Sequence, residues 1–476
     1  MNDANQVSEG IRVGAWRKGR AGFLKVGLVL GSLAAMTGLV HAQALSPDDS
    51  LTYKGITLYG VVDLGLQYQT HGAPISDFFP AGSADIVQKN SNHSILGITP
   101  NNLSQSRIGL NGKEDLFDDW SAVFKLETFF NPQSGEISDA CKSLAQNNGR
   151  SVASGTQTTN LDSSVCGQAF QQSFAGFSSK TYGTIVFGRQ NTLIADGVAK
   201  YDPNAASQAF SLIGLSGTTA GGGDTQNRRF DQSAKYTNII ADIVHVGVMY
   251  KFNGAWGSAS TAWEHNLGFN YAGFSLDAYY AKIRNALALA SLSAAQVGDL
   301  PGLGYSSSNA LAATVSDNTA FDFMAMYTWD VLKFYGGYEH ISYGNPQTPL
   351  AAGFDVDAYK IAFVNNAAYP INKVLQVYWT GVKWAFNPQL DFTAAWYYYK
   401  QNNYAVVAAD LGCNTNIAAT CAGNTDDYSA DVVWKMTKRF AGYTGLMYTA
   451  VHGGQANGYV FHTNDVTGTI GIRYTF

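Results

Sequence analysis

Hydrophobic and polar residues alternate one by one, in segments of roughly ten residues, from Lys54 to the C-terminus. Successive side chains of an extended strand point to opposite faces, so each such segment has one apolar face and one polar face. In the last segment, TGTIGIRYTF, the side chains of Ile470, Ile472 and Tyr474 share one face, and Thr469 and Arg473 lie on the other. The pattern therefore predicts a protein built from strands.

Sixteen strands are expected, and the connections between them fall into two alternating classes. The strands are expected near residues 55–67, 104–116, 120–130, 170–179, 183–191, 227–237, 243–253, 261–272, 274–287, 319–329, 333–344, 374–386, 389–404, 427–439, 443–452 and 465–476. Short turns such as YAGF (271–274) alternate with long polar loops near 68–103, 131–169, 191–227, 288–318, 344–373 and 405–427. Short turns at one rim and long loops at the other are typical of a closed, antiparallel transmembrane β-barrel.

A soluble β-sandwich or a multi-domain exported β-protein is the alternative, and the aromatic residues argue against both. Tyr and Trp gather at expected strand ends in YYAK (279–282), YWTGVKW (378–384) and WYYYK (396–400). Such residues form the aromatic girdles of membrane barrels, whereas a sandwich would carry polar residues on its outer faces. Inside lipid a closed sheet also satisfies every backbone group. We therefore expect an all-β fold, a transmembrane antiparallel barrel.

The composition supports strands over apolar helices. Charged residues make up 14% of the 476 residues, below the roughly 25% of ordinary soluble chains, while aromatic residues reach 13%. The mean hydropathy is −0.09. Apart from the N-terminal region, no apolar run reaches the roughly 18 residues of a spanning helix.

The N-terminal region is typical of a secretory signal. Basic residues from Arg17 to Lys25 precede the apolar run VGLVLGSLAAMTGLV, and small residues follow it, so cleavage after Ala42 or Ala44 is expected. The run is short for the alternative, a membrane anchor. We expect a signal peptide at residues 1–42 and the barrel at 43–476. Removing the signal leaves 25 basic and 33 acidic side chains, a net charge of −8 that argues against a nucleic-acid partner.

Four cysteines lie in the expected exported part of the chain, where disulfides form. They are Cys141, Cys166, Cys413 and Cys421. Four cysteines allow three connectivities, of which we predict the two local pairs, 141–166 and 413–421. Because no CxxC motif or histidine cluster accompanies them, we expect neither a metal nor a cofactor.

Several stretches resemble the general porins of Gram-negative bacteria. They are TLYGVVDLGL (57–66), SRIGLNGKEDL (106–116), FAGFSSKTYGTIVFGRQNTL (174–193), KYTN (235–238) and IGIRYTF (470–476). The resemblance implies a homotrimeric outer-membrane channel for small hydrophilic solutes, in contact with the lipid bilayer and lipopolysaccharide. It also implies that the barrel-assembly machinery reads the last strand, with Tyr474 and Phe476. The cysteines and the length of loops 131–169 and 405–427 depart from the family pattern.

The resemblance further implies a charged constriction, in which the third long loop folds inward after TIVFGRQNTL. The acidic side chains expected on that loop are Asp196, Asp202 and Asp224. The basic side chains expected on the facing wall are Arg107, Lys125, Arg189, Arg228 and Arg229. Alternation alone also places Arg107 and Lys125 on polar faces, whereas only the resemblance places Arg189. Opposed rings of charge would filter ions by sign.

Two functional hypotheses remain on this barrel. One is a general diffusion porin, and the other is a solute-selective channel or a loop-based adhesin, suggested by the enlarged loops. Catalysis is not expected, because the histidines are scattered and the sequence contains neither G-x-S-x-G nor H-E-x-x-H.

Overall fold

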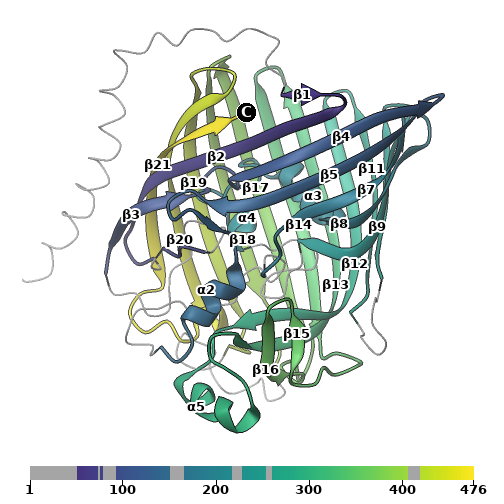
Figure 1. Ribbon diagram of the computed structural model, residues 1–476. Coiled ribbons are helices and arrows are strands. Elements are labelled where there is room, and N and C mark those ends of the chain that lie inside the picture. The colour runs from purple at the N-terminus through teal and green to yellow at the C-terminus, as the bar shows by residue number, and fades with distance from the viewer. Residues whose placement is uncertain are drawn as a thin grey trace, which may run out of the picture. The chain divides into compact units, whose positions relative to one another are not determined.

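Sixteen antiparallel strands form a closed wall in a computed structural model that describes residues 51–72, 75–78, 93–150, 166–216, 228–252, 260–405 and 419–476 (Figure 1). The wall strands are β2 (Ile56–Gln69), β4 (Arg107–Phe117), β5 (Trp120–Asn131), β7 (Gln172–Ser179), β8 (Gly183–Asn191), β9 (Arg229–Ile240), β10 (Val244–Lys251), β11 (Ala262–Tyr271), β12 (Phe274–Ala290), β13 (Ala310–Trp329), β14 (Leu332–Gly344), β17 (Lys373–Asn387), β18 (Leu390–Gln401), β19 (Gly423–Lys435), β20 (Phe440–Gly453) and β21 (Asn464–Thr475). The predicted fold class is confirmed.

The barrel closes where the last strand pairs with the first. β21 and β2 are antiparallel, with Val61 opposite Thr475 at one end and Gln69 opposite Thr467 at the other. Phe476 extends this pairing. Its backbone N–H donates to the Gly60 carbonyl and its carbonyl accepts from the Gly60 N–H, both at 3.0 Å. The signal peptide predicted at residues 1–42 lies outside the described residues.

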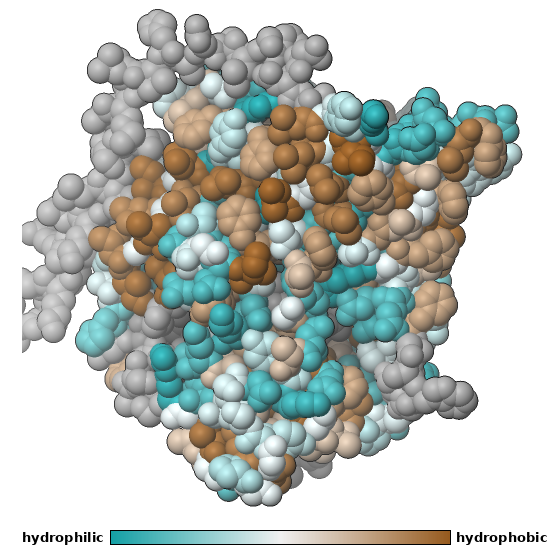
Figure 2. All heavy atoms as spheres, in the orientation of Figure 1, coloured by the Kyte–Doolittle hydropathy of each residue, from teal (hydrophilic) through white to brown (hydrophobic). Residues whose placement is uncertain are grey.

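The wall has an apolar outer face, as the alternation predicts. On β13 the side chains of Phe321 and Phe323 are 47% and 55% exposed, whereas Asp322 and Met324 between and beside them are fully buried. Figure 2 shows hydrophobic residues gathered over the strands in the upper half of this face, with hydrophilic residues toward the end that carries the long loops. Exposed apolar side chains of this kind face lipid in membrane barrels. No helix in the described ranges is long and apolar enough to span a membrane.

Tight turns at one rim have backbone conformations that suit two-residue hairpins. Ala272 (φ 49°) and Gly273 (φ 84°) connect β11 to β12, and Asp330 (φ 52°) lies between β13 and β14. Positive φ at such positions matches the right-handed twist of the paired strands. On the outer face near this rim, Trp384 packs against Phe386 and Phe392 with ring centroids 5.1 and 5.7 Å away. These rings form part of an aromatic girdle.

Regular structure also occurs inside five of the expected long loops. The further elements are β1 (Thr52–Tyr53), β3 (Ile95–Pro100), β6 (Glu136–Ile137), β15 (Phe354–Val356), β16 (Tyr359–Asn365), α2 (Ala140–Gln146), α3 (Leu193–Tyr201), α4 (Leu212–Ser216), α5 (Ala294–Leu303) and η5 (Gly454–Ala456). The prediction of loops at 288–318 and 344–373 is therefore wrong in part. The strand ends there are covered on both faces, so they lack the period-2 pattern that marks a half-buried strand.

Candidate functional site

The third long loop, between β8 and β9, lies inside the barrel. Thr192 caps α3 by accepting a hydrogen bond from the Ala195 N–H at 3.2 Å, which fixes where the helix begins. The apolar side chains of α3, such as Ile194 and Val198, pack in one cluster with Met249 and Met324, which face inward from β10 and β13. This burial holds the helix against the inner wall.

Asp202 secures the end of α3 to the wall. The sequence predicts that it faces the basic side chains, but the structure buries it against Tyr397 of β18 instead. Its carboxylate accepts hydrogen bonds from the Tyr397 hydroxyl at 2.6 Å and from the Ala206 N–H at 2.7 Å. The residue is only 1% exposed, and this burial raises the pKa of the Asp202 carboxyl. Next to it, Trp379 Nε1 donates to the Tyr201 carbonyl at 3.1 Å. A buried carboxylate with these partners serves the position of the loop.

Farther along, the loop reaches the opposite part of the wall. The Ala209 N–H donates to the Asn102 carbonyl at 3.0 Å, and Phe210 packs edge-on against Tyr443 of β20. On the return path Arg228 donates to the Gly214 carbonyl at 3.1 Å. The described part of the loop therefore crosses the lumen. Asp224 lies outside the described residues.

Arg107 and Lys125 lie together on the inner wall, as alternation predicts. Both contact Glu127, with nitrogen–oxygen distances of 3.4 Å in each case. The Tyr59 hydroxyl donates to the same carboxylate at 2.9 Å, and the Lys125 ammonium lies 5.6 Å from the centroid of the Tyr59 ring. Two cations around one acid leave this cluster with an excess of positive charge.

Asp196 on α3 faces the wall, and its partner is a lysine that the sequence analysis missed. The Lys235 ammonium lies 2.9 Å from the Asp196 carboxylate, which is half exposed, and it also donates to the Asn191 carbonyl at 2.9 Å. Because β9 is paired with β8, from which α3 emerges, this ion pair fixes the base of the loop to the adjacent wall, and Asp196 also acts electrostatically on Lys125. The sequence signal for Lys235 is the motif KYTN (235–238), which it begins and which contributes to the family resemblance.

The other predicted arginines lie at the outer end of the wall. Arg189 is 9% exposed at an irregularity between β8 and β9, where it pairs with Asp231 and donates to the Gln171 side chain at 3.1 Å. The Arg229 guanidinium stacks over the Phe129 ring, 4.7 Å from its centroid. Phe129 is opposite Arg107 in the strand register, so Arg229 extends the Arg107–Lys125 cluster outward.

A second basic cluster, also missed, lies inside the barrel near the short-turn rim. Lys383 and Lys435 both contact Asp391, at 3.6 and 2.8 Å. Lys333 is directly opposite Lys383 in the register of β14 and β17. Period 2 would place Lys333 and Lys383 on one face, but only the pairing of the two strands shows that they are neighbours.

The predicted cysteines form disulfides wherever the structure describes them, and the C-terminal residues pack in an aromatic group. Cys141 and Cys166 form a disulfide with a Cα–Cα distance of 4.9 Å. Cys421 is also disulfide-bonded, while Cys413 lies outside the described residues. Tyr474 points outward next to Phe440 and Phe476, with ring centroids 6.5 and 6.3 Å away. In the described part of the chain, no group of three or more His, Cys, Asp or Glu side chains could hold a metal ion.

Comparison with known proteins identifies the family. The family model described as Gram-negative porin matches residues 30–454. An outer membrane porin protein of Bordetella pertussis is 28% identical over 228 residues, which cover 48% of this chain and 47% of that relative. The chain thus aligns with about half the length of that relative.

Solved structures share the fold. An anion-selective porin from Comamonas acidovorans has a TM-score of 0.54 at 17% identity, covering 88% of this chain and 99% of its own. OmpT of Vibrio cholerae, expressed in the outer membrane, has a TM-score of 0.55 at 14% identity, and the match covers 90% of this chain and 100% of that chain. The trimer form of OmpT has a TM-score of 0.53 at 13% identity, and the match covers 88% of this chain and 99% of that chain. With its closed wall of sixteen strands and its inward third loop, the chain belongs to the Gram-negative porin family and is a β-barrel protein of the outer membrane.

Proposed function

We propose that the barrel is a passive channel for small hydrophilic solutes and ions, narrowed where α3 faces the Arg107–Lys125 cluster. Barrels of this strand number leave an aqueous lumen, and charged side chains at a narrowing set its preference. The observation that carries the proposal is that Asp196, which Lys235 holds at 2.9 Å at the base of the loop, also interacts electrostatically with Lys125 of the wall cluster. Charges of opposite sign from the loop and from the wall therefore act on the same part of the lumen.

The channel is proposed to prefer anions. Each inner cluster holds more basic than acidic side chains. Arg107 and Lys125 surround Glu127, and Lys333, Lys383 and Lys435 lie near Asp391 and Asp431. In water a unit charge about 7 Å from a passing ion contributes about 0.6 kcal/mol, or roughly a threefold change in local ion concentration. The name of the Comamonas acidovorans porin, which is described as anion-selective, agrees with this sign.

Conductance in a planar lipid bilayer tests the channel proposal. The purified, folded protein should give stepwise currents that rise linearly with voltage in symmetric KCl. A heat-unfolded sample of the same preparation is the control, because it retains the sequence and any contaminants without the barrel. Folded barrels that give no steps above this control would refute the proposal. Saturable block by one solute class would instead favour the solute-selective alternative.

A homotrimer is the proposed assembly, which the trimer form of the Vibrio cholerae structure supports by analogy of fold. An apolar hollow of about 570 Å³ lies on the outer face of β2, β4, β5, β7 and β8, lined in part by Gly112, Ala122, Gly176 and Phe187. Small residues there allow the barrel of a second copy to approach closely. Light scattering of the detergent-solubilised protein should give three copies, and a monomer would contradict the assignment.

Biogenesis is proposed to follow the family pattern. The signal peptide at residues 1–42 would direct export, and the barrel-assembly machinery would read Tyr474 and Phe476 on the last strand. The exposed apolar face would then contact the bilayer and lipopolysaccharide. Support comes from the position of Phe476, whose backbone is already paired with Gly60 at the seam of the barrel.

A further inference from the structure

The β12–β13 hairpin extends beyond the strands that flank it. Pairing of β11 with β12 ends at Ala262 opposite Ile283, and pairing of β14 with β13 ends at Gly344 opposite Asp317. A bulge follows Ile283, where Asn285 has a φ of 52° and donates its N–H to Asp317 at 2.9 Å. Bulges bend strands.

Beyond the bulge the hairpin forms the centre of a small folded unit, here named the cap (residues 140–146, 286–303, 310–316 and 354–365). β16 pairs in parallel with β13, from Lys360 opposite Ala310 to Asn365 opposite Thr314, and β15 pairs with β16. α2 packs on one face of this sheet with Leu311, and α5 packs on the other with Ala310. The cap therefore has its own two-sided apolar core.

The cap joins parts of the wall that are far apart around the barrel. α2 belongs to the loop between β5 and β7, yet the paired strands β7, β8, β9, β10 and β11 separate β5 from β12. At its end the Gly149 N–H donates to the Leu292 carbonyl at 2.8 Å, and the Asn148 side chain donates to the Ala310 carbonyl at 2.8 Å. The loop therefore reaches across the outer mouth of the barrel.

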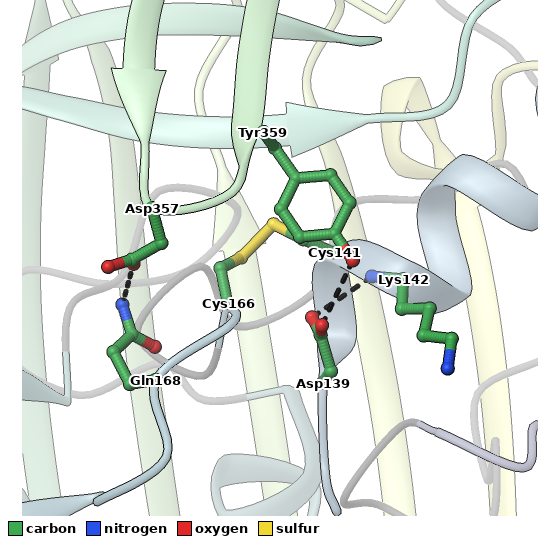
Figure 3. Close-up of a disulfide and its surroundings, with 7 residues drawn as sticks. All are labelled: Asp139, Cys141, Lys142, Cys166, Gln168, Asp357 and Tyr359. Carbon is green, nitrogen blue, oxygen red and sulfur yellow. Dashed lines mark hydrogen bonds between the residues drawn. A yellow bond between two sulfur atoms is a disulfide. The ribbon is translucent and has the colours of Figure 1, made fainter. Parts of the chain in front are cut away.

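A disulfide clamp holds the β15–β16 turn of the cap (Figure 3). Cys141 and Cys166 are both fully buried. Two residues before Cys141, Asp139 accepts a hydrogen bond from the Tyr359 hydroxyl at 2.9 Å. Two residues after Cys166, Gln168 donates to the Asp357 carboxylate. The disulfide thus positions one partner for each side of the turn.

The clamp leaves an acidic side chain exposed above the wall. Asp357 is exposed, and the Arg189–Asp231 pair at the outer ends of β8 and β9 acts on it electrostatically. Although its side chain reaches solvent, neighbouring groups displace part of its hydration, which raises the pKa of Asp357 to about 6. Asp231 and Asp139 raise it too, and Arg189 lowers it. The other carboxylate of this hairpin, Asp355, instead pairs with Lys360. The turn is therefore within electrostatic reach of wall strands that are not its sequence neighbours.

We propose that the clamped β15–β16 turn is an entrance filter of the channel, and that Asp357 there lowers the access of small anions to the basic clusters below. This inference rests on the proposed channel function. A carboxylate beside the mouth repels anions within roughly a Debye length, about 8 Å at physiological salt. The disulfide keeps the carboxylate in place, because it fixes Gln168 and Asp139 on either side.

The experiment is a reversal-potential measurement in a KCl gradient with three proteins of full length: wild type, Asp357→Asn, and Asp355→Asn with Lys360→Gln, which removes an ion pair without changing the net charge. Asparagine keeps an acceptor for Gln168 and removes only the charge. Asp357→Asn should raise the anion-to-cation permeability ratio about twofold to threefold at pH 7.5, whereas the matched control Asp355→Asn with Lys360→Gln should leave it unchanged. In wild type the ratio should also rise as the pH falls through about 6, because Asp357 becomes protonated, and Asp357→Asn should remove that step.

The clamp is tested by adding Cys141→Ser and Cys166→Ser to both backgrounds. If the disulfide positions Asp357, then Asp357→Asn should have a smaller effect in the double-serine protein than in wild type. Absence of conductance in wild type would refute the channel function itself. Normal conductance with equal ratios in wild type and Asp357→Asn would refute only the filter. An undiminished Asp357→Asn effect without the disulfide would overturn the clamp.

Discussion

Replacing Asp202 by alanine should release the end of α3 from the barrel wall. The carboxylate is 1% exposed and accepts hydrogen bonds from the Tyr397 hydroxyl at 2.6 Å and the Ala206 N–H at 2.7 Å. Alanine leaves both donors without this acceptor in a site that water does not reach freely. The matched control is Asp196→Ala, because Asp196 lies on the same loop but is half exposed and ion-paired to Lys235.

The size of the effect follows from the two lost bonds. A buried donor left without a partner costs about 1–3 kcal/mol, so two donors give about 2–6 kcal/mol. At the lower bound the local opening of the loop becomes about 30-fold more frequent. The exposed pair of Asp196 is worth only about 0–1 kcal/mol, so its loss changes opening little.

Hydrogen exchange followed by mass spectrometry measures this opening directly. Peptides from residues 193–206 should exchange about 30-fold or more faster in Asp202→Ala, while peptides from β13 stay protected. Tyr397→Phe, which removes only the hydroxyl, serves if the alanine variant assembles poorly, and it should give a smaller acceleration. Equal exchange in Asp202→Ala and Asp196→Ala would refute the anchoring role of Asp202.

Three further outcomes are expected. Gly60→Ala should lower the yield of folded barrel, because a Cβ at this position would lie 2.3 Å from the Phe476 ring. Gly298→Ala is the control, because a Cβ there would have no atom within 4 Å. Equal yields of the two variants on heat-modifiability gels would contradict this. Deleting Phe476 should reduce assembled barrel in the outer membrane without blocking export, and an unchanged amount would show that the residue is dispensable. Mass spectrometry of non-reduced peptides should find Cys413 joined to Cys421, and a free thiol at either position would exclude that pair.

The wall could be predicted from the sequence because its faces meet different surroundings. Lipid on one side and polar side chains on the other impose period 2, which placed β2, β21 and the inward Arg107 and Lys125. The cap could not be predicted in this way. Both faces of its strands are buried, by α2 and α5, so residues such as Leu311 and Ala312 give no alternation.

The site was predictable only in part, because contacts between residues far apart in the sequence determine which charged side chains are buried and which residues they pair with. Asp202 and Asp196 look alike in the sequence, yet Asp202 meets Tyr397 after a separation of 195 residues and is buried, while Asp196 meets Lys235 and stays half exposed. Arg189 was placed by family resemblance, and its engagement with Asp231 at the outer end of the wall depends on a local irregularity that the alternation could not show.

The claim that the basic side chains around Glu127 give the channel its anion preference is tested by the reversal potential of the double variant Arg107→Gln, Lys125→Gln in a KCl gradient. Both side chains contact Glu127 on the inner wall, so the double variant converts a cluster of net positive charge into one of negative charge. Lys113→Gln is the matched control, because Lys113 shares the inward face of β4 with Arg107 but lies near the β4–β5 turn, away from α3, and is paired with Asp115. We expect anion preference in wild type and in the control, and a shift toward cations in the double variant. A reversal potential that is the same in all three proteins would contradict it.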